Sequence, residues 1–156
     1  MKTVLFVCTA NIARSPMAEV LFNKIADKKG FGGQFQARSA GTWARNGIPA
    51  PPHGQQVMSN RGLDTSNHLS REITESMIST ASLVLTMEAG HKEALQVEFP
   101  AHREKVFMLS EMVGEEMDID DPYFMGIEKY EETANELGNI LDGGMIKILK
   151  LAGEKG

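Results

Sequence analysis

Residues 2–16, KTVLFVCTANIARSP, carry the features from which the fold is predicted. The first six, KTVLFV, form a short apolar run with β-branched residues, which is typical of a strand buried on both faces of a parallel sheet. Ser15 and Pro16 favour a helix start, with Ser15 as the N-cap and Pro16 at the first helical position. We therefore expect a strand, a short loop and a helix in this order.

Strand and helix patterns continue to alternate along the chain. The apolar runs predict further strands at 35–40, 81–87 and 106–109. Helical patterns are predicted at about 52–60, 74–79, 88–98 and 130–152, although Gly143 and Gly144 should weaken the last one locally. This alternation predicts an α/β fold, a parallel sheet with helices on both faces and the loop between the first strand and the first helix at its carboxyl edge.

Composition limits the classes of function. The 156 residues, 42% of them hydrophobic, suit a single domain over residues 1–156. A formal charge of -5 argues against a broad nucleic-acid-binding face. The apolar run near the start is too short for a signal peptide or a membrane span. Together with a lone Cys, these features predict a cytoplasmic protein that binds neither nucleic acid nor membrane.

The segment Cys8-Thr9-Ala10-Asn11-Ile12-Ala13-Arg14-Ser15 can form an anion cradle. Its small residues let the backbone wrap, so that successive N–H groups converge beside the positive end of the following helix. A thiol in this position is stabilised as a thiolate and becomes a nucleophile, while the planar guanidinium of Arg14 can hold two phosphoryl oxygens. An Arg six residues after a Cys is common by chance, and the strand before and helix after are what favour the catalytic interpretation.

A second group of polar residues, DIDDPY at 118–123, crowds three carboxylates together. Crowding disfavours simultaneous ionisation, so that one carboxyl can serve as a general acid. Asp121 and Pro122 are equally typical of an ordinary helix start, where Asp is favoured as the charged carboxylate. These residues alone leave both interpretations open.

Five segments occur in a characteristic order: VLFVCTANIARSPMAE, RSAGTW, HLSREIT, LVLTMEAGHKEAL and DDPY. The Cys-x5-Arg-Ser-Pro segment with a distant Asp-Pro-Tyr is highly specific in combination. Over nearly its whole length the chain resembles the low-molecular-weight protein tyrosine phosphatase family. The resemblance implies a four-stranded parallel sheet, a phosphocysteine intermediate and no metal or organic cofactor.

By position in the family pattern, the resemblance implies Cys8 as the nucleophile, Arg14 as the phosphate-binding residue and Asp121 as the acid, then base. The expected substrate is a phosphotyrosine-containing protein or small aryl phosphate, with inorganic phosphate as product, and the expected state is a monomer or weak homodimer. The remaining matches are the cradle residues Thr9, Ala10, Asn11, Ile12, Ala13 and Ser15, the cleft aromatics Trp43 and Tyr123, and the supporting residues Ser39 and His68. Asn11 should tolerate a left-handed backbone.

Several alternatives stay open at this point. A protein arginine phosphatase uses the same scaffold, but relatives with that activity carry Thr where this loop has Ile12, and an apolar side chain favours a phenyl ring. A non-catalytic phosphotyrosine-binding module would be expected to lack Cys8 or Asp121. The absence of a second Cys, at Ala13 or elsewhere, disfavours an arsenate reductase. His53, His91 and His102 show no ligand spacing and are predicted to be surface residues.

Overall fold

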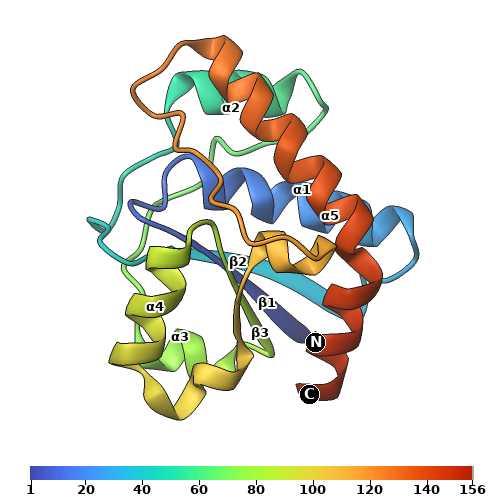
Figure 1. Cartoon of the computed structure of the whole chain (residues 1–156). Coiled ribbons are helices and arrows are strands. Elements are labelled where there is room, and N and C mark those ends of the chain that lie inside the picture. Colours follow the sequence, from blue (N-terminus) through green and yellow to red (C-terminus); the bar gives the residue numbers. More distant parts are fainter. Residues whose placement is uncertain (156) are drawn as a thin grey trace.

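The centre of the molecule is a parallel sheet with the strand order β2-β1-β3-β4 (Figure 1). The structure, a computed structural model, describes the backbone of residues 1–155 and the side chains of residues 1–153. Its strands are β1 Lys2–Cys8, β2 Phe35–Gly41, β3 Leu83–Thr86 and β4 Val106–Met108. The predicted four-stranded parallel α/β sheet is confirmed. Residue 156, which the predicted domain includes, lies outside the described residues.

Five α-helices surround this sheet within the described part of the chain. They are α1 Arg14–Lys28, α2 Pro52–Ser59, α3 Glu75–Thr80, α4 Ala89–Glu98 and α5 Ile127–Lys155, with short 3₁₀ helices η1 Pro100–Lys105 and η2 Leu109–Val113. Figure 1 shows α1 and α5 together on one side of the sheet and α3 and α4 on the other. Helices therefore cover both faces, as the alternating pattern predicts.

The central strand β1 divides the core into two halves. Because successive side chains of a strand point to opposite faces, Val4 and Phe6 join the core beneath α1 and α5, whereas Leu5 and Val7 join the core beneath α3 and α4. All four side chains are buried. Burial on both faces explains why KTVLFV reads as a continuous apolar run rather than an alternating one.

Neither Ser15, the predicted N-cap of the first helix, nor Asp121, for which a helix start is one of two open interpretations, caps a helix. Helix α1 begins at Arg14, and its N-cap Ala13 forms no side-chain cap bond, so Ser15 does not cap it. The Ser15 hydroxyl instead bonds to side chains inside the cradle. Asp121 does not begin a helix either, because α5 starts only at Ile127 and residues 121–125 form a turn. The Ser15 and Asp121 side chains thus bond within the loop and the turn that they belong to instead of capping a helix.

Helix α5 runs unbroken through Gly143 and Gly144. A Cβ atom at Gly144 would lie 2.8 Å from Met112 Cβ and 3.1 Å from the Met112 carbonyl oxygen. Glycine at this position therefore lets α5 pack closely on η2, and tertiary packing offsets the low helix propensity of the residue. Within the described residues, no helix has the length and apolar character needed to cross a membrane.

Candidate active site

The loop between β1 and α1 wraps tightly against the carboxyl end of β2. Cys8 pairs with Gly41 across the sheet, and Trp43 N–H donates to the Thr9 carbonyl oxygen at 3.0 Å. A Cβ atom at Gly41 would lie only 2.4 Å from that oxygen and 3.1 Å from the Asn11 nitrogen. Glycine at position 41 is what allows β2 to support the loop this closely.

Asn11 holds the middle of the loop in place. Its φ of 58° is the left-handed value that the sequence predicts. The side chain donates from Nδ2 to Ser15 Oγ at 2.8 Å and accepts from the Arg71 N–H at Oδ1, 2.9 Å away. His68 Nε2 lies 2.6 Å from the Asn11 carbonyl oxygen. One buried side chain therefore joins the helix end of the loop to the segment before α3.

Ser39 belongs to the predicted supporting network, but the structure does not connect it to the loop. It lies buried in β2, opposite Phe6 in β1. Its hydroxyl oxygen has no hydrogen-bond partner among the described residues. The network around the loop forms through Asn11, Ser15 and His68 without it.

Cys8 ends β1 with its sulfur inside the loop. The side chain is buried, and Sγ lies 2.9 Å from Ser15 Oγ. Because Asn11 Nδ2 already donates to that same oxygen, the Ser15 hydroxyl hydrogen is available to the sulfur. The arrangement suits a negatively charged sulfur at the positive end of α1.

The buried guanidinium of Arg14 is held closely at Nη1 and only loosely at its other nitrogens. Nη1 donates to Glu88 Oε2 at 2.5 Å and to the Ile119 carbonyl oxygen at 2.6 Å. Nη2 makes only longer contacts, 3.5 Å to Thr9 Oγ1 and 3.7 Å to Asp121 Oδ2, and Nε has no partner among the described residues. The edge formed by Nε and Nη2 is the one left for a ligand that accepts two hydrogen bonds.

Glu88 and His91 are site residues that the sequence reasoning missed, and the prediction that His91 is a surface residue is wrong. The imidazole is buried and links Glu88 to the loop. Its Nδ1 accepts from the Glu88 N–H at 3.2 Å, so Nε2 carries the proton and donates to Thr9 Oγ1 at 2.8 Å. Burial lowers the pKa of His91 and nearby Arg14 lowers it further, while Glu88 opposes both. Glu88 is the N-cap of α4 and His91 is the third residue of that helix, and each side chain bonds to the backbone of the other residue. This capping box is the signal in the sequence EAGH at 88–91 from which both residues could have been found.

Asp121 lies at the mouth of the loop. Its Oδ1 accepts from the Tyr123 N–H at 3.1 Å, which fixes the turn, and its Oδ2 lies 3.7 Å from Arg14 Nη2. The side chain is 44% exposed. The structure thus brings together the carboxylate, the guanidinium and the thiol that the sequence places far apart.

A cavity of about 360 Å³ unites these groups. Cys8, Arg14 and Asp121 line it together with Glu88 and Tyr123. The other lining residues are Thr9, Ala10, Ile12, Ala13 and Phe124. The cavity therefore combines a thiol, a guanidinium and two carboxyl groups with an apolar wall.

Trp43 does not lie where the sequence reasoning expects it. It is not among the residues that line the cavity, and its side chain is 83% exposed. Its backbone N–H is fixed on the Thr9 carbonyl oxygen, so the residue supports the loop through the main chain. The second aromatic wall comes from Phe124, which packs edge-on against Tyr123 with 4.6 Å between ring centroids.

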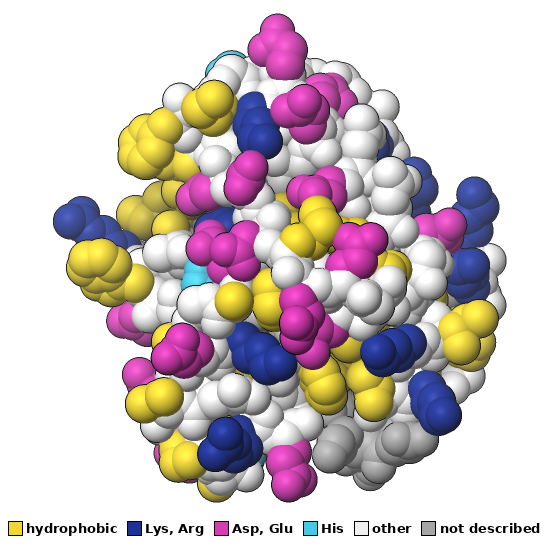
Figure 2. All heavy atoms as spheres, in the orientation of Figure 1, with side chains coloured by type: hydrophobic (Ala, Val, Ile, Leu, Met, Phe, Trp, Pro, Cys, Tyr) yellow, Lys and Arg dark blue, Asp and Glu magenta, His cyan; other side chains and the backbone are white. Residues whose placement is uncertain are grey.

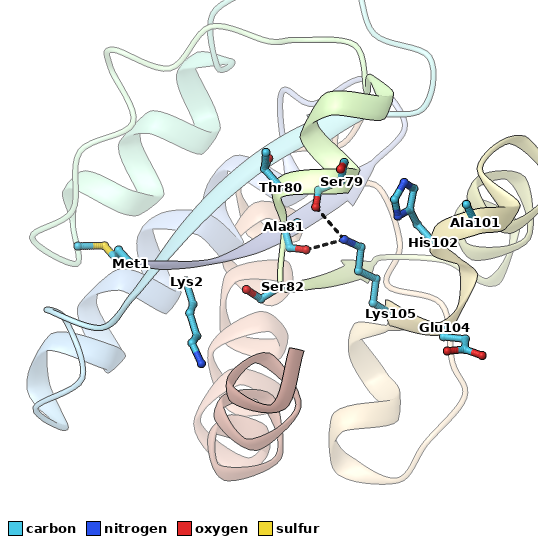
Figure 3. Close-up of a pocket in the computed structure, with 10 residues that line it drawn as sticks. All are labelled: Met1, Lys2, Ser79, Thr80, Ala81, Ser82, Ala101, His102, Glu104 and Lys105. Atoms are coloured by element: carbon cyan, nitrogen blue, oxygen red, sulfur yellow. Dashed lines mark hydrogen bonds between the residues drawn. The ribbon is translucent and has the colours of Figure 1, made fainter. Parts of the chain in front are cut away.

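A separate hollow of about 510 Å³ lies at the opposite, amino-terminal end of the strands (Figure 3). Lys105 points into it and donates to the carbonyl oxygens of Ser79 and Ala81. Ligands of parallel α/β sheets bind at the carboxyl ends of the strands, where Cys8 lies. Because Cys8, Arg14 and Asp121 also line the cavity at that end, we place the candidate site at the loop after β1.

Comparison with known proteins agrees with this geometry. Residues 3–151 match the family described as low molecular weight phosphotyrosine protein phosphatase. The chain belongs to this family. Its fold, its strand-loop-helix unit and its activity class, that of a phosphatase acting on phosphoproteins, follow from membership.

Individual relatives of this phosphatase differ in the substrate that their names give. The protein-arginine-phosphatase of Bacillus subtilis (strain 168) is 39% identical over 139 residues, 88% of this chain and 91% of that protein. A probable low molecular weight protein-tyrosine-phosphatase of Ralstonia nicotianae is 36% identical over 150 residues, 96% of this chain and 98% of its own. The crystal structure of a low molecular weight protein tyrosine phosphatase from T. tengcongensis has a TM-score of 0.89 at 39% identity, covering 96% of this chain and 100% of that chain.

Proposed function

We propose that this phosphatase hydrolyses phosphotyrosine through a phosphocysteine intermediate, with Cys8 as nucleophile, Arg14 as phosphate-binding residue and Asp121 as general acid, then base. The observation that carries the proposal is that Arg14, whose Nε has no hydrogen-bond partner among the described residues, lines one cavity with Cys8 and Asp121. The substrate is a phosphotyrosine-containing protein or a small aryl phosphate. An unpaired reactive thiol of this kind suits a reducing, cytoplasmic compartment.

In the first step the phosphoryl group binds in the loop, with Arg14 Nε and Nη2 donating to two of its oxygens. The Cys8 sulfur attacks phosphorus, the S–P bond forms and the bond from phosphorus to the phenol oxygen breaks. Asp121 gives its proton to the departing oxygen, so that neutral phenol leaves. Backbone N–H groups at the start of α1 and the Arg14 guanidinium stabilise the charge on the transferring group.

In the second step a water molecule hydrolyses the phosphocysteine. The Asp121 carboxylate accepts a proton from the water, whose oxygen attacks phosphorus, and the S–P bond breaks. The Ser15 hydroxyl, 2.9 Å from Cys8 Sγ, stabilises the departing thiolate. Inorganic phosphate is released and Asp121 is protonated again for the next cycle.

The preference for tyrosine rests on the wall of the cavity above the loop. Ile12, Tyr123 and Phe124 line it, and an apolar branched side chain beside two aromatic rings favours a flat phenyl ring. Ile12 offers no hydroxyl to a phosphoguanidinium, which would lose hydrogen bonds to water without replacement on entering. A phenyl ring has no such cost.

Phosphoarginine is the second candidate substrate. The similarity to the Bacillus subtilis protein-arginine-phosphatase favours it, and so does the presence of two carboxylates, Glu88 and Asp121, in the cavity. A guanidinium could pair with Asp121, which is partly exposed, whereas Glu88 is already bound to Arg14. The two candidate substrates differ in the side chain that they favour at position 12: phosphotyrosine favours an apolar one and phosphoarginine favours one with a hydroxyl.

The deciding experiment measures kcat/KM on matched phosphotyrosine, phosphoserine and phosphoarginine peptides in the presence of a chelator. We expect turnover of phosphotyrosine only, and its loss in Cys8→Ser. Ile12→Thr should raise the ratio of phosphoarginine to phosphotyrosine turnover about tenfold, because the new hydroxyl can pair with a guanidinium. Ile12→Val is the matched control, since it keeps a branched apolar side chain.

The outcomes separate the candidates. Preferential turnover of phosphoarginine by the unaltered chain would show that the thiolate chemistry is right and the specificity argument wrong. Tight binding of phosphotyrosine without turnover would place the protein among binding modules. Full activity of Cys8→Ser would contradict the mechanism itself.

A further inference from the structure

A second, apolar groove of about 520 Å³ adjoins the catalytic cavity. The segment 48–53, IPAPPH, and Tyr130 form its outer part, and Ile12, Tyr123 and Phe124 line both hollows. Figure 2 shows hydrophobic side chains gathered at the upper left, over the loop that enters α5. The three shared residues therefore form a ridge between two adjoining spaces.

The groove differs from the catalytic cavity in its chemistry. No Lys, Arg, Asp or Glu lines it in the described part of the chain, whereas Arg14, Glu88 and Asp121 line the cavity. Its walls are aliphatic, proline and aromatic, with His53 as the one residue of basic character. Such a surface favours an uncharged apolar side chain over a polar one.

The wall of the groove formed by residues 48–53 and Tyr130 is also fixed before any ligand arrives. Ile48 N–H donates to Ser70 Oγ at 2.9 Å, and Ser70 N–H donates to the Ile48 carbonyl oxygen at 2.8 Å. Three prolines, at positions 49, 51 and 52, restrict the backbone. The His53 ring packs edge-on against the Tyr130 ring, with 5.7 Å between the ring centroids. A preformed groove binds a ligand without first losing chain entropy.

We propose that this groove is a substrate subsite that takes an apolar side chain one or two residues away from the phosphorylated residue of a protein substrate. Because consecutive Cα atoms are about 3.8 Å apart, such a side chain can cross the ridge while the phosphorylated residue occupies the catalytic cavity. The inference rests on the proposed protein phosphatase function and adds to it a class of preferred sequence. It holds for either phosphorylated residue, because it concerns the neighbouring positions.

The test compares phosphopeptides that differ only in those neighbours. Both flanking pairs of residues are Leu in one peptide and Asn in the other, so that size is matched and no charge is changed. We expect the unaltered chain to show a roughly fivefold higher kcat/KM for the Leu peptide, since only part of each side chain is buried. Turnover of p-nitrophenyl phosphate, which fills only the cavity, provides the reference.

Two variants locate the preference. Ile48→Asn should reduce the Leu-to-Asn ratio to below about twofold and leave p-nitrophenyl phosphate turnover within about twofold, because Ile48 lines the groove and not the cavity. Val97→Asn, at a residue 75% exposed on α4, makes the same kind of change elsewhere and should leave the ratio unaltered. Ile48→Ala tests the same wall, should Ile48→Asn fail to fold.

The outcomes of this test distinguish failure of the subsite from failure of the proposed function. Equal turnover of both peptides by the unaltered chain, or an unchanged ratio in both Ile48 variants, would overturn the subsite even if phosphotyrosine is the substrate. If only phosphoarginine peptides are turned over, the tyrosine proposal fails and the same flanking series in phosphoarginine form decides the subsite. A dimer that Ile48→Asn dissociates, measured by light scattering, with no flanking preference would assign the groove to a second copy of the chain.

Discussion

Arg14 Nη1 donates to Glu88 Oε2 at 2.5 Å, joining the loop after β1 to the start of α4. The two residues are 74 positions apart in the chain. The contact occupies Nη1 of the guanidinium, while Nε has no hydrogen-bond partner among the described residues. Glu88 thereby orients Arg14 rather than simply neutralising it.

Glu88→Ala should lower kcat/KM for phosphotyrosine by about tenfold, because a misaligned guanidinium no longer offers both donors to the phosphoryl oxygens. Glu88→Gln keeps an oxygen acceptor at the same place and should stay within about threefold of the unaltered chain. Steady-state kinetics on p-nitrophenyl phosphate and a phosphotyrosine peptide check this. Equal losses in both variants would show that the charge, and not the orientation, is what Glu88 provides.

The general-acid role that we propose for Asp121 predicts a dependence of the rate on the leaving group. Asp121→Asn should lower kcat/KM by about a hundredfold for a phosphotyrosine peptide, whose phenol needs a proton as it departs. The loss should be smaller for p-nitrophenyl phosphate, because nitrophenolate leaves without one. Kinetics on a series of aryl phosphates measure the slope against leaving-group basicity. The same loss for every ester would argue against proton donation by Asp121.

Asn11 contributes both a left-handed backbone conformation and side-chain hydrogen bonds, and two substitutions separate these contributions to stability. Asn11→Gly removes the bonds to Ser15 and Arg71 but accepts the φ of 58°, whereas Asn11→Ala removes the bonds and adds strain. Asn11→Ala should therefore be about 1 kcal/mol less stable than Asn11→Gly. Urea unfolding followed by circular dichroism provides the comparison. Identical midpoints would contradict the strain.

Neighbouring glycines in α5 predict opposite effects on stability. Gly144→Ala should destabilise by roughly 1–3 kcal/mol, because its Cβ would meet Met112 Cβ at 2.8 Å. Gly143→Ala meets only Val113 Cγ1 at 3.5 Å and should stabilise by about 0.5–1 kcal/mol through helix propensity. Thermal unfolding of the pair provides an internal control. A loss of stability in both variants would point to backbone distortion in α5.

His91 predicts a loss of stability in mild acid. Its pKa is lowered from the ordinary 6.5 by burial and by Arg14, so the unfolded chain takes up this proton at a higher pH than the folded chain. The stabilising contribution is complete above pH 6.5 and is lost as the pH falls below that value toward the lowered pKa. His91→Gln should flatten this part of the profile. Urea unfolding of both proteins from pH 7.5 down checks the slope, and parallel profiles would contradict the assignment.

Local patterns in the sequence determined the elements and the loop that carries the chemistry. The apolar run before Cys8, the small residues after it and the Asn at position 11 impose a strand, a tight turn and a left-handed residue through short-range sterics. The alternation of strands and helices determined the parallel sheet, because right-handed crossovers leave few other arrangements. These features depend on neighbours in the chain and can be read without coordinates.

Only the tertiary structure decided what surrounds Arg14 and where the aromatic walls lie. Glu88, His91 and Ile119 contact Arg14 or Thr9 across 74, 82 and 105 positions of the chain, and no local pattern encodes such contacts. The Trp43 backbone N–H is held on the loop while its ring is exposed, and Ser15 bonds to Cys8 instead of capping α1. The contacts of Arg14 and Trp43 join segments far apart in the chain, and Ser15 meets Cys8 only once the loop has closed, so the folded structure alone reveals them.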